Sequence, residues 1–158
     1  MRLVHLSDLH LGYRQYQRLT PGGVNQREAD LAATFRTAID RVIALRPDVI
    51  VFAGDIFHSV RPPNQAILHA FIQFGRLVQA LPDATIILLA GNHDSPRSAE
   101  TGGILQLFAQ LGLNVVDREP QHLSFPDRGL SVLAVPDVPG LVRPSFTPDP
   151  GARYNVLV

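Results

Sequence analysis

The sequence predicts an α/β fold built around a parallel β-sheet. Three observations support this: apolar runs at 48–53 and 85–90, amphipathic segments that follow each run, and their regular alternation along the chain. Strands that are apolar throughout are typical of sheets covered on both faces, and strand–helix alternation favours parallel pairing. We therefore expect parallel strands with helices on both faces of the sheet.

Composition narrows the classes of function. The chain has 158 residues, enough for one domain with a substantial core, and 46% of them are hydrophobic. Its 14 basic residues, all arginine, balance 14 acidic ones, so the total charge does not indicate a nucleic-acid binder, although a local basic groove is compatible with it. The absence of cysteine excludes disulfides and thiolate sites, and the absence of lysine excludes a complete P-loop. Neither G-x-G-x-x-G nor G-x-S-x-G occurs, which argues against a dinucleotide site and a nucleophile elbow.

The first predicted elements are a strand at 2–6, a polar loop and a helix that ends before Pro47. Asn25 followed by Glu28 resembles a capping box and predicts where the helix begins. Apolar residues then recur at spacings of three and four, which predicts one buried stripe: Leu31, Phe35, Ile39, Val42 and Leu45.

The next predicted helix has the same apolar spacing as the first. Pro62 and Pro63 precede a predicted helix at 64–81, between the apolar strands at 48–53 and 85–90. Its expected buried stripe again follows spacings of three and four: Ile67, Phe71, Phe74, Val78 and Leu81.

The remaining elements are shorter. A third helix is predicted from about 98 to 111, with Gly112 as its C-cap. Short strands are expected at 114–117, 122–125, 130–135 and, after a proline-rich loop, 154–158.

Three loops that follow predicted strands carry residues of the kinds that bind metals. Asp8 and His10 follow the first strand, Asp55 and His58 the second, and Asn92 and His93 the third. Each loop alone is also compatible with ordinary turn residues or exposed histidines. Because the carboxyl ends of parallel strands lie at one edge of a sheet, the three loops together predict a shared site.

The ligand types at this edge suit particular metals. Carboxylate, imidazole and amide oxygen without sulfur favour Mn²⁺, Mg²⁺, Fe or Zn²⁺. Asp55, on the central strand, is the candidate bridge between two ions, and His93 is a candidate general acid or phosphate-stabilising group. Such a site suits phosphoester hydrolysis.

The motifs D-x-H (8–10), GD (54–55) and GNHD (91–94) resemble those of the calcineurin-like metallophosphoesterase superfamily. The resemblance implies a four-layered α/β/β/α sandwich and a two-metal, usually Mn²⁺-dependent, phosphodiester hydrolase. It implies that Asp8 and His10 bind one ion, that Asp55 bridges both and that Asn92 binds the other. By the same resemblance, His93 is the catalytic histidine, and His58 contacts the phosphate or helps to stabilise the transition state.

Three details resemble the SbcD-type DNA repair exonucleases more narrowly: the HLSDLHLG opening, the histidine in GDIFHSVRP and the GNHDSP loop. This resemblance implies DNA as substrate, a role in double-strand-break repair, an SbcC-type ATPase partner and a homodimer. The second and third helices are where the dimer contact is expected.

The sequence also departs from the family. The family completes its site with further histidines, including a G-H-x-H motif, whereas the last histidine here is His122. We therefore expect residues 1–158 to be the N-terminal portion of a metallophosphoesterase domain. A phosphoesterase acting on nucleotides or phosphoproteins, and a catalytically silent truncated domain with a scaffold or partner-binding role, stay open as alternatives. Without a secretory signal or a long apolar run in the sequence, a cytoplasmic location is expected.

Overall fold

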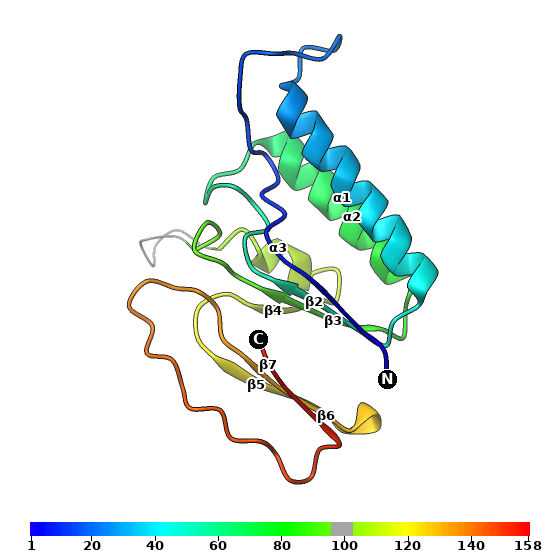
Figure 1. Cartoon of the computed structure of the whole chain (residues 1–158), viewed down its shortest axis with the longest axis vertical. Helices are drawn as coiled ribbons and strands as arrows, with labels where there is room; N and C mark the ends of the chain where they lie inside the picture. Colours follow the sequence, from blue (N-terminus) through cyan, green and yellow to red (C-terminus); the bar gives the residue numbers. More distant parts are fainter. Residues whose placement is uncertain (96–102) are drawn as a thin grey trace.

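A computed structural model describes residues 1–95 and 103–158 (Figure 1). The elements follow the predicted order closely. They are β1 (Leu3–Leu6), α1 (Gln26–Leu45), β2 (Val49–Ala53), α2 (Asn64–Ala80), β3 (Thr85–Leu89), α3 (Gln106–Ala109), β4 (Asn114–Val116), β5 (Gln121–Phe125), a 3₁₀ turn (Pro126–Arg128), β6 (Leu130–Ala134) and β7 (Tyr154–Leu157).

The first sheet is parallel, with its four strands in the order β1-β2-β3-β4. Each crossover therefore steps in the same direction, and right-handed crossovers of this kind leave all connecting helices on one face. Figure 1 shows α1, α2 and α3 together on that face. The prediction of helices on both faces is wrong, because strand order, which decides the face, cannot be read from a local pattern.

The face that the helices cover contains the larger core. Phe52 of β2 meets Phe74 of α2 edge to face, with ring centroids 5.0 Å apart, and Phe108 of α3 lies 4.9 Å from Phe74. All three rings are fully buried. The helices are thereby fixed against the strands whose ends carry the candidate ligands.

A second, three-stranded sheet covers the opposite face. Its strand order is β5-β6-β7, with β5 antiparallel and β7 parallel to β6. Val49 and Val51 of β2 pack with Val132 and Ala134 of β6 in a separate core between the sheets. Every α-helix of the described residues packs on the first sheet, so these residues form three layers of the four that the resemblance implies.

The predicted start of α1 is confirmed: the Asn25 side chain accepts hydrogen bonds from the backbone of Arg27 and Glu28. The predicted helix stripes are correct only in part. Leu45 of α1 is exposed, since it lies in the last turn beyond the edge of the core. In α2 the most buried residues are Ala66, Ala70, Gln73, Phe74 and Leu77, whereas the other predicted positions of that stripe are partly buried.

The third predicted helix is shorter than expected where it is described. Residues 98–102 of that prediction lie outside the described residues, and α3 begins only at Gln106. The C-cap of α3 is Gln110 rather than the predicted Gly112, which lies two residues further on and has a positive φ of 89°. No helix in the described ranges is both long and apolar enough to cross a membrane.

Candidate metal centre

The chain takes an unusual backbone conformation where β1 and β2 end. Asp8, His10 and Asp55 have φ values of 58°, 44° and 53°, in the left-handed region that non-glycine residues rarely adopt. Each such residue costs of the order of 1–3 kcal/mol unless the surroundings impose it, and such strain gathers at functional sites. Hydrogen bonds between the two loops hold these conformations. The His10 N–H donates to the Asp55 carbonyl at 2.9 Å, and the Asp8 N–H donates to the Gly54 carbonyl at 3.2 Å.

The glycines of the GD and GN motifs allow two loops to touch. A Cβ on Gly54 would lie 3.0 Å from the Cα of Gly91, and Gly54 also has a φ of 86°. A Cβ on Gly91 would overlap the carboxylate and the backbone nitrogen of Asp55. Only glycine at both positions lets the β2 and β3 loops approach this closely.

Asp8, His10 and Asp55 form the first group of possible metal ligands. The Nε2 atom of His10 lies 4.0 Å from Oδ1 of Asp8 and 3.8 Å from Oδ2 of Asp55. Donor atoms that each lie ~2.1 Å from one ion are themselves ~3–4 Å apart. These three side chains therefore have the spacing of ligands to a single ion.

His10, His58 and His93 form a second group that shares His10 with the first. The ring centroids of His10 and His93 lie 4.9 Å apart, and the rings of His58 and His93 stack at 5.1 Å. Nδ1 of His93 lies 2.8 Å from the backbone carbonyl of His58, so Nδ1 carries the proton and donates it. The Nε2 atom of His93 is then the nitrogen with a free lone pair.

The environment of His58 favours its neutral form. Burial lowers the pKa of His58, and the neighbouring rings of His93 and His10 lower it further, while Asp55 acts in the opposite direction. Tyr13 covers another side of the ring, with centroids 4.4 Å apart. His58 is thus enclosed by aromatic rings and remains close to the first ligand group.

The family profile of the calcineurin-like phosphoesterases matches residues 1–152. The chain belongs to the calcineurin-like phosphoesterase family. Curated relatives named DNA double-strand break repair protein Mre11 are also similar to it. The relative from Methanococcus maripaludis is 39% identical over 126 residues, which are 78% of this chain and 32% of the relative.

Two further Mre11 relatives match a shorter stretch. The protein from Methanocaldococcus jannaschii is 36% identical over 97 residues, 61% of this chain and 24% of its own length. That from Sulfolobus acidocaldarius is 39% identical over 100 residues, 63% of this chain and 24% of its own length. The chain thus spans about a quarter to a third of the curated relatives it matches.

The donor set fits the divalent ions that calcineurin-like phosphoesterases use. Asp8, His10 and Asp55 offer two carboxylates and one imidazole, a mixture suited to Mn²⁺, Fe or Zn²⁺. Asn92, the fourth predicted ligand, lines a cavity of about 310 Å³ together with Asp8 and Asp55. The structure therefore brings all four residues to one edge of the sheet, with His58 and His93 beside them.

The sequence did not reveal the role of Asp94 at this candidate site. Its buried carboxylate accepts hydrogen bonds from the backbone N–H groups of Phe57 at 2.9 Å, Ile56 at 3.0 Å and Gly91 at 3.1 Å. Burial raises the pKa of Asp94, whereas these three donors lower it. Asp94 ties the β2 and β3 loops together. The motif GNHD includes Asp94, but the motif alone does not indicate that this side chain turns inward.

Proposed function

We propose that this chain carries part of the active site of a two-metal-dependent phosphodiester hydrolase that cleaves DNA during double-strand-break repair. The observation that supports this best is the spacing of the His10, Asp8 and Asp55 donor atoms, directly beside the His58 and His93 rings. Such an arrangement combines metal ligands with groups able to hold or transfer a proton.

Asp8 and His10 would hold one ion, Asp55 would bridge it to a second, and Asn92 would contribute to the second. When bound, the ions would act as Lewis acids on the phosphoryl group. We favour Mn²⁺, with Mg²⁺, Fe and Zn²⁺ as the other candidates.

Two histidines complete the proposed machinery. His93 donates its Nδ1 proton to the His58 carbonyl, which fixes the ring and leaves Nε2 free to accept or deliver a proton. His58, kept neutral by burial and by its neighbours, would contact the phosphate. Its ring is held in place between Tyr13 and His93, so the contact needs little rearrangement.

The name shared by the three relatives, DNA double-strand break repair protein Mre11, supports DNA as substrate and break repair as the process. An SbcC-type ATPase subunit, a homodimer and a cytoplasmic location belong to the same proposal. Helices α2 and α3 offer an apolar surface for the dimer. One shallow depression on this surface is lined by Ile67, Leu68, Phe71 and Leu107. Leu68 is 60% exposed and Leu107 38%, and contiguous exposed apolar side chains are typical of interaction surfaces.

The test is digestion of a duplex DNA with free ends by the full-length protein, with and without Mn²⁺. The proposal predicts Mn²⁺-stimulated release of nucleotides or short fragments. Hydrolysis of small phosphodiesters without any action on DNA would favour a phosphoesterase acting on nucleotides or phosphoproteins. Absence of both activities and of Mn²⁺ binding would favour a silent domain with a scaffold or partner-binding role.

A further inference from the structure

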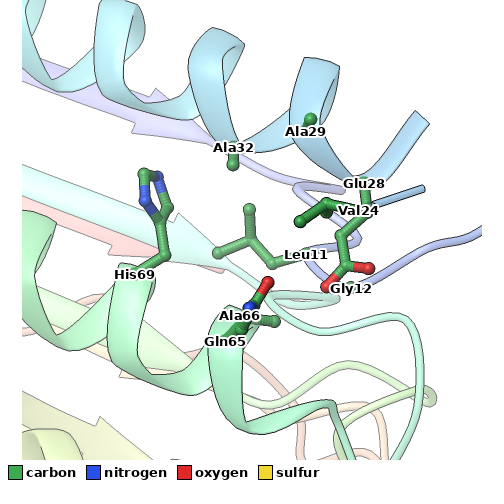
Figure 2. A pocket seen from close by; sticks show the side chains of 9 residues that line it. All are labelled: Leu11, Gly12, Val24, Glu28, Ala29, Ala32, Gln65, Ala66 and His69. Atoms are coloured by element: carbon green, nitrogen blue, oxygen red, sulfur yellow. The ribbon is translucent and has the colours of Figure 1, made fainter. Parts of the chain in front are cut away.

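Two layers of the fold contribute to the candidate metal centre. Leu11 and Gly12, which follow His10 directly, belong to the layer on the helix side. Figure 2 shows Gly12 beside Ala66 near the start of α2, and a Cβ on Gly12 would lie only 3.2 Å from the Cβ of Ala66. The loop after β6 of the second sheet lines the cavity that Asn92 also lines. The helices thus support the loop after β1, whereas the second sheet supplies part of the cavity wall.

The contribution of the second sheet includes a third carboxylate. Asp137 lies three residues beyond the end of β6 and lines the cavity of about 310 Å³ together with Asp8, Asp55 and Asn92. None of the described residues that line this cavity is basic, so three carboxylates share the space without a cationic side chain among them. Like charges in a small space repel one another, and a divalent cation relieves that repulsion.

Backbone hydrogen bonds hold Asp137 at the end of β3. Its N–H donates to the carbonyl of Ala90 at 2.9 Å, two residues before Asn92. Its carbonyl accepts from the hydroxyl of Ser95 at 3.2 Å, and Ser95, which follows Asp94, is only 3% exposed. These contacts use the backbone of Asp137 alone, so its carboxylate can be replaced without removing them.

We propose that Asp137 is an additional carboxylate of the second metal site, where its negative charge stabilises the ion assigned to Asp55 and Asn92. This inference rests on the proposed two-metal centre. Asp137 belongs to neither of the two close groups of candidate ligands, so its charge acts across the cavity. Because Asn92 is neutral and Asp55 is shared between the ions, a further negative charge on this side balances the second ion.

This role predicts an effect on one ion rather than on both. His10 is not among the residues that line the cavity of Asp137, so the ion assigned to Asp8 and His10 should be little affected when the charge of Asp137 is removed. The affinity for the second ion should fall ~10–100-fold, the range seen when groups that support metal ligands are lost.

Titration of the metal-free, full-length protein with Mn²⁺, followed by calorimetry and by the electron paramagnetic resonance of free Mn²⁺, tests the proposal. We expect two ions per chain in the wild type and selective weakening of the second by Asp137→Asn. Asp137→Glu keeps the charge and should retain most of the second affinity. Asp137→Ser is a second neutral variant and should repeat the effect of Asp137→Asn. Asp127→Asn, in the exposed turn at the other end of β6, is the matched control and should bind like the wild type.

The possible results separate the role of Asp137 from the proposed function. A wild-type protein that binds fewer than two ions would contradict the two-metal centre, and the role of Asp137 with it. Two ions in the wild type and unchanged binding by the neutral variants would overturn the role of Asp137 alone. So would equal weakening by Asp137→Asn and Asp137→Glu, because charge would then not be the cause. Loss of both ions by neutral variants that keep the wild-type circular dichroism and thermal unfolding would overturn the selective effect on the second ion.

Discussion

The carboxylate of Asp94 accepts the backbone N–H of Phe57 at 2.9 Å, and this bond joins the loop after β3 to the loop after β2. The same carboxylate also accepts from Ile56 and Gly91. Asp55 and Asn92, on the two loops, are therefore positioned by a residue that need not contact substrate or metal. Asp94 is a positioning residue of the candidate site.

Replacing Asp94 by Asn should loosen the site and destabilise the fold. An amide cannot accept from all three N–H groups without turning its own donors toward one of them, which costs ~1–3 kcal/mol for each unsatisfied buried group. We also expect Mn²⁺ affinity to fall ~10–100-fold, as for other losses of groups that orient ligands. Urea unfolding and Mn²⁺ titration measure the two effects. Asp127→Asn, at an exposed position, is the control, and equal behaviour of the two variants would contradict the assignment.

Gly91→Ala should disrupt the contact between the β2 and β3 loops. The added Cβ would overlap the carboxylate of Asp55, so either Asp55 or the β3 loop must move. The expected result is a loss of stability of ~1–3 kcal/mol from overpacking, with weakened Mn²⁺ binding. Gly75→Ala in α2 is the matched control because its Cβ meets nothing within 4 Å, and it should stabilise the helix by ~0.5–1 kcal/mol. If Gly91→Ala has the unfolding free energy and the Mn²⁺ affinity of the wild type, the close approach of the two loops is unimportant.

The place where the candidate ligands meet was predictable from the sequence because it depends on the ends of the strands. Asp8, Asp55 and Asn92 each lie within three residues of the end of a parallel strand, and parallel pairing brings such ends together on whichever face the helices lie. The face taken by the helices was not predictable, since it depends on strand order. The buried stripe of α2 was also missed in part, because small residues such as Ala66 and Ala70 are buried whereas the larger Ile67 and Phe71 are only partly buried.

The second histidine group shows another limit of the sequence. Spacing indicated that His58 follows β2, yet its position beside His93 also involves two contacts between loops: the His58 N–H donates to the Leu11 carbonyl, and the His58 carbonyl accepts from Nδ1 of His93. These contacts join loops that are distant in sequence, so local patterns do not reveal them.

His69 should make the stability of the protein depend on pH. Burial lowers the pKa of this histidine below its ordinary value of 6.5, so between the folded and unfolded values the unfolded chain binds more protons. The contribution of neutral His69 to the unfolding free energy is therefore fully present above pH 6.5, and it is lost as the pH falls through the folded-state pKa. His69→Phe should flatten the pH dependence of the unfolding free energy in this range, measured with urea. The control is His5→Phe, at an exposed site, which should keep the wild-type pH dependence. If His69→Phe also keeps the wild-type pH dependence, His69 is not its source.

His58→Ala should separate binding from chemistry. The Asp8, His10 and Asp55 group does not include His58, so Mn²⁺ affinity should change little. Phosphodiester cleavage by the full-length protein should slow, by ~10²–10⁴-fold if His58 acts on the transferring phosphoryl group. Single-turnover cleavage and Mn²⁺ titration on the same preparation measure the two quantities. Equal losses in both would make His58 a metal ligand, in keeping with its proximity to His10 and His93.

The most direct test of the proposed centre is the number of Mn²⁺ ions bound per chain by the full-length protein and its Asp55→Asn variant, measured by titration calorimetry. Oδ2 of Asp55 lies 3.8 Å from Nε2 of His10, and Asp55 lines the same cavity as Asn92. A bridging role for Asp55 therefore predicts two ions in the wild type and loss of tight binding at both sites in the variant. An Asp55→Asn protein that still binds two ions with wild-type affinity would contradict the account.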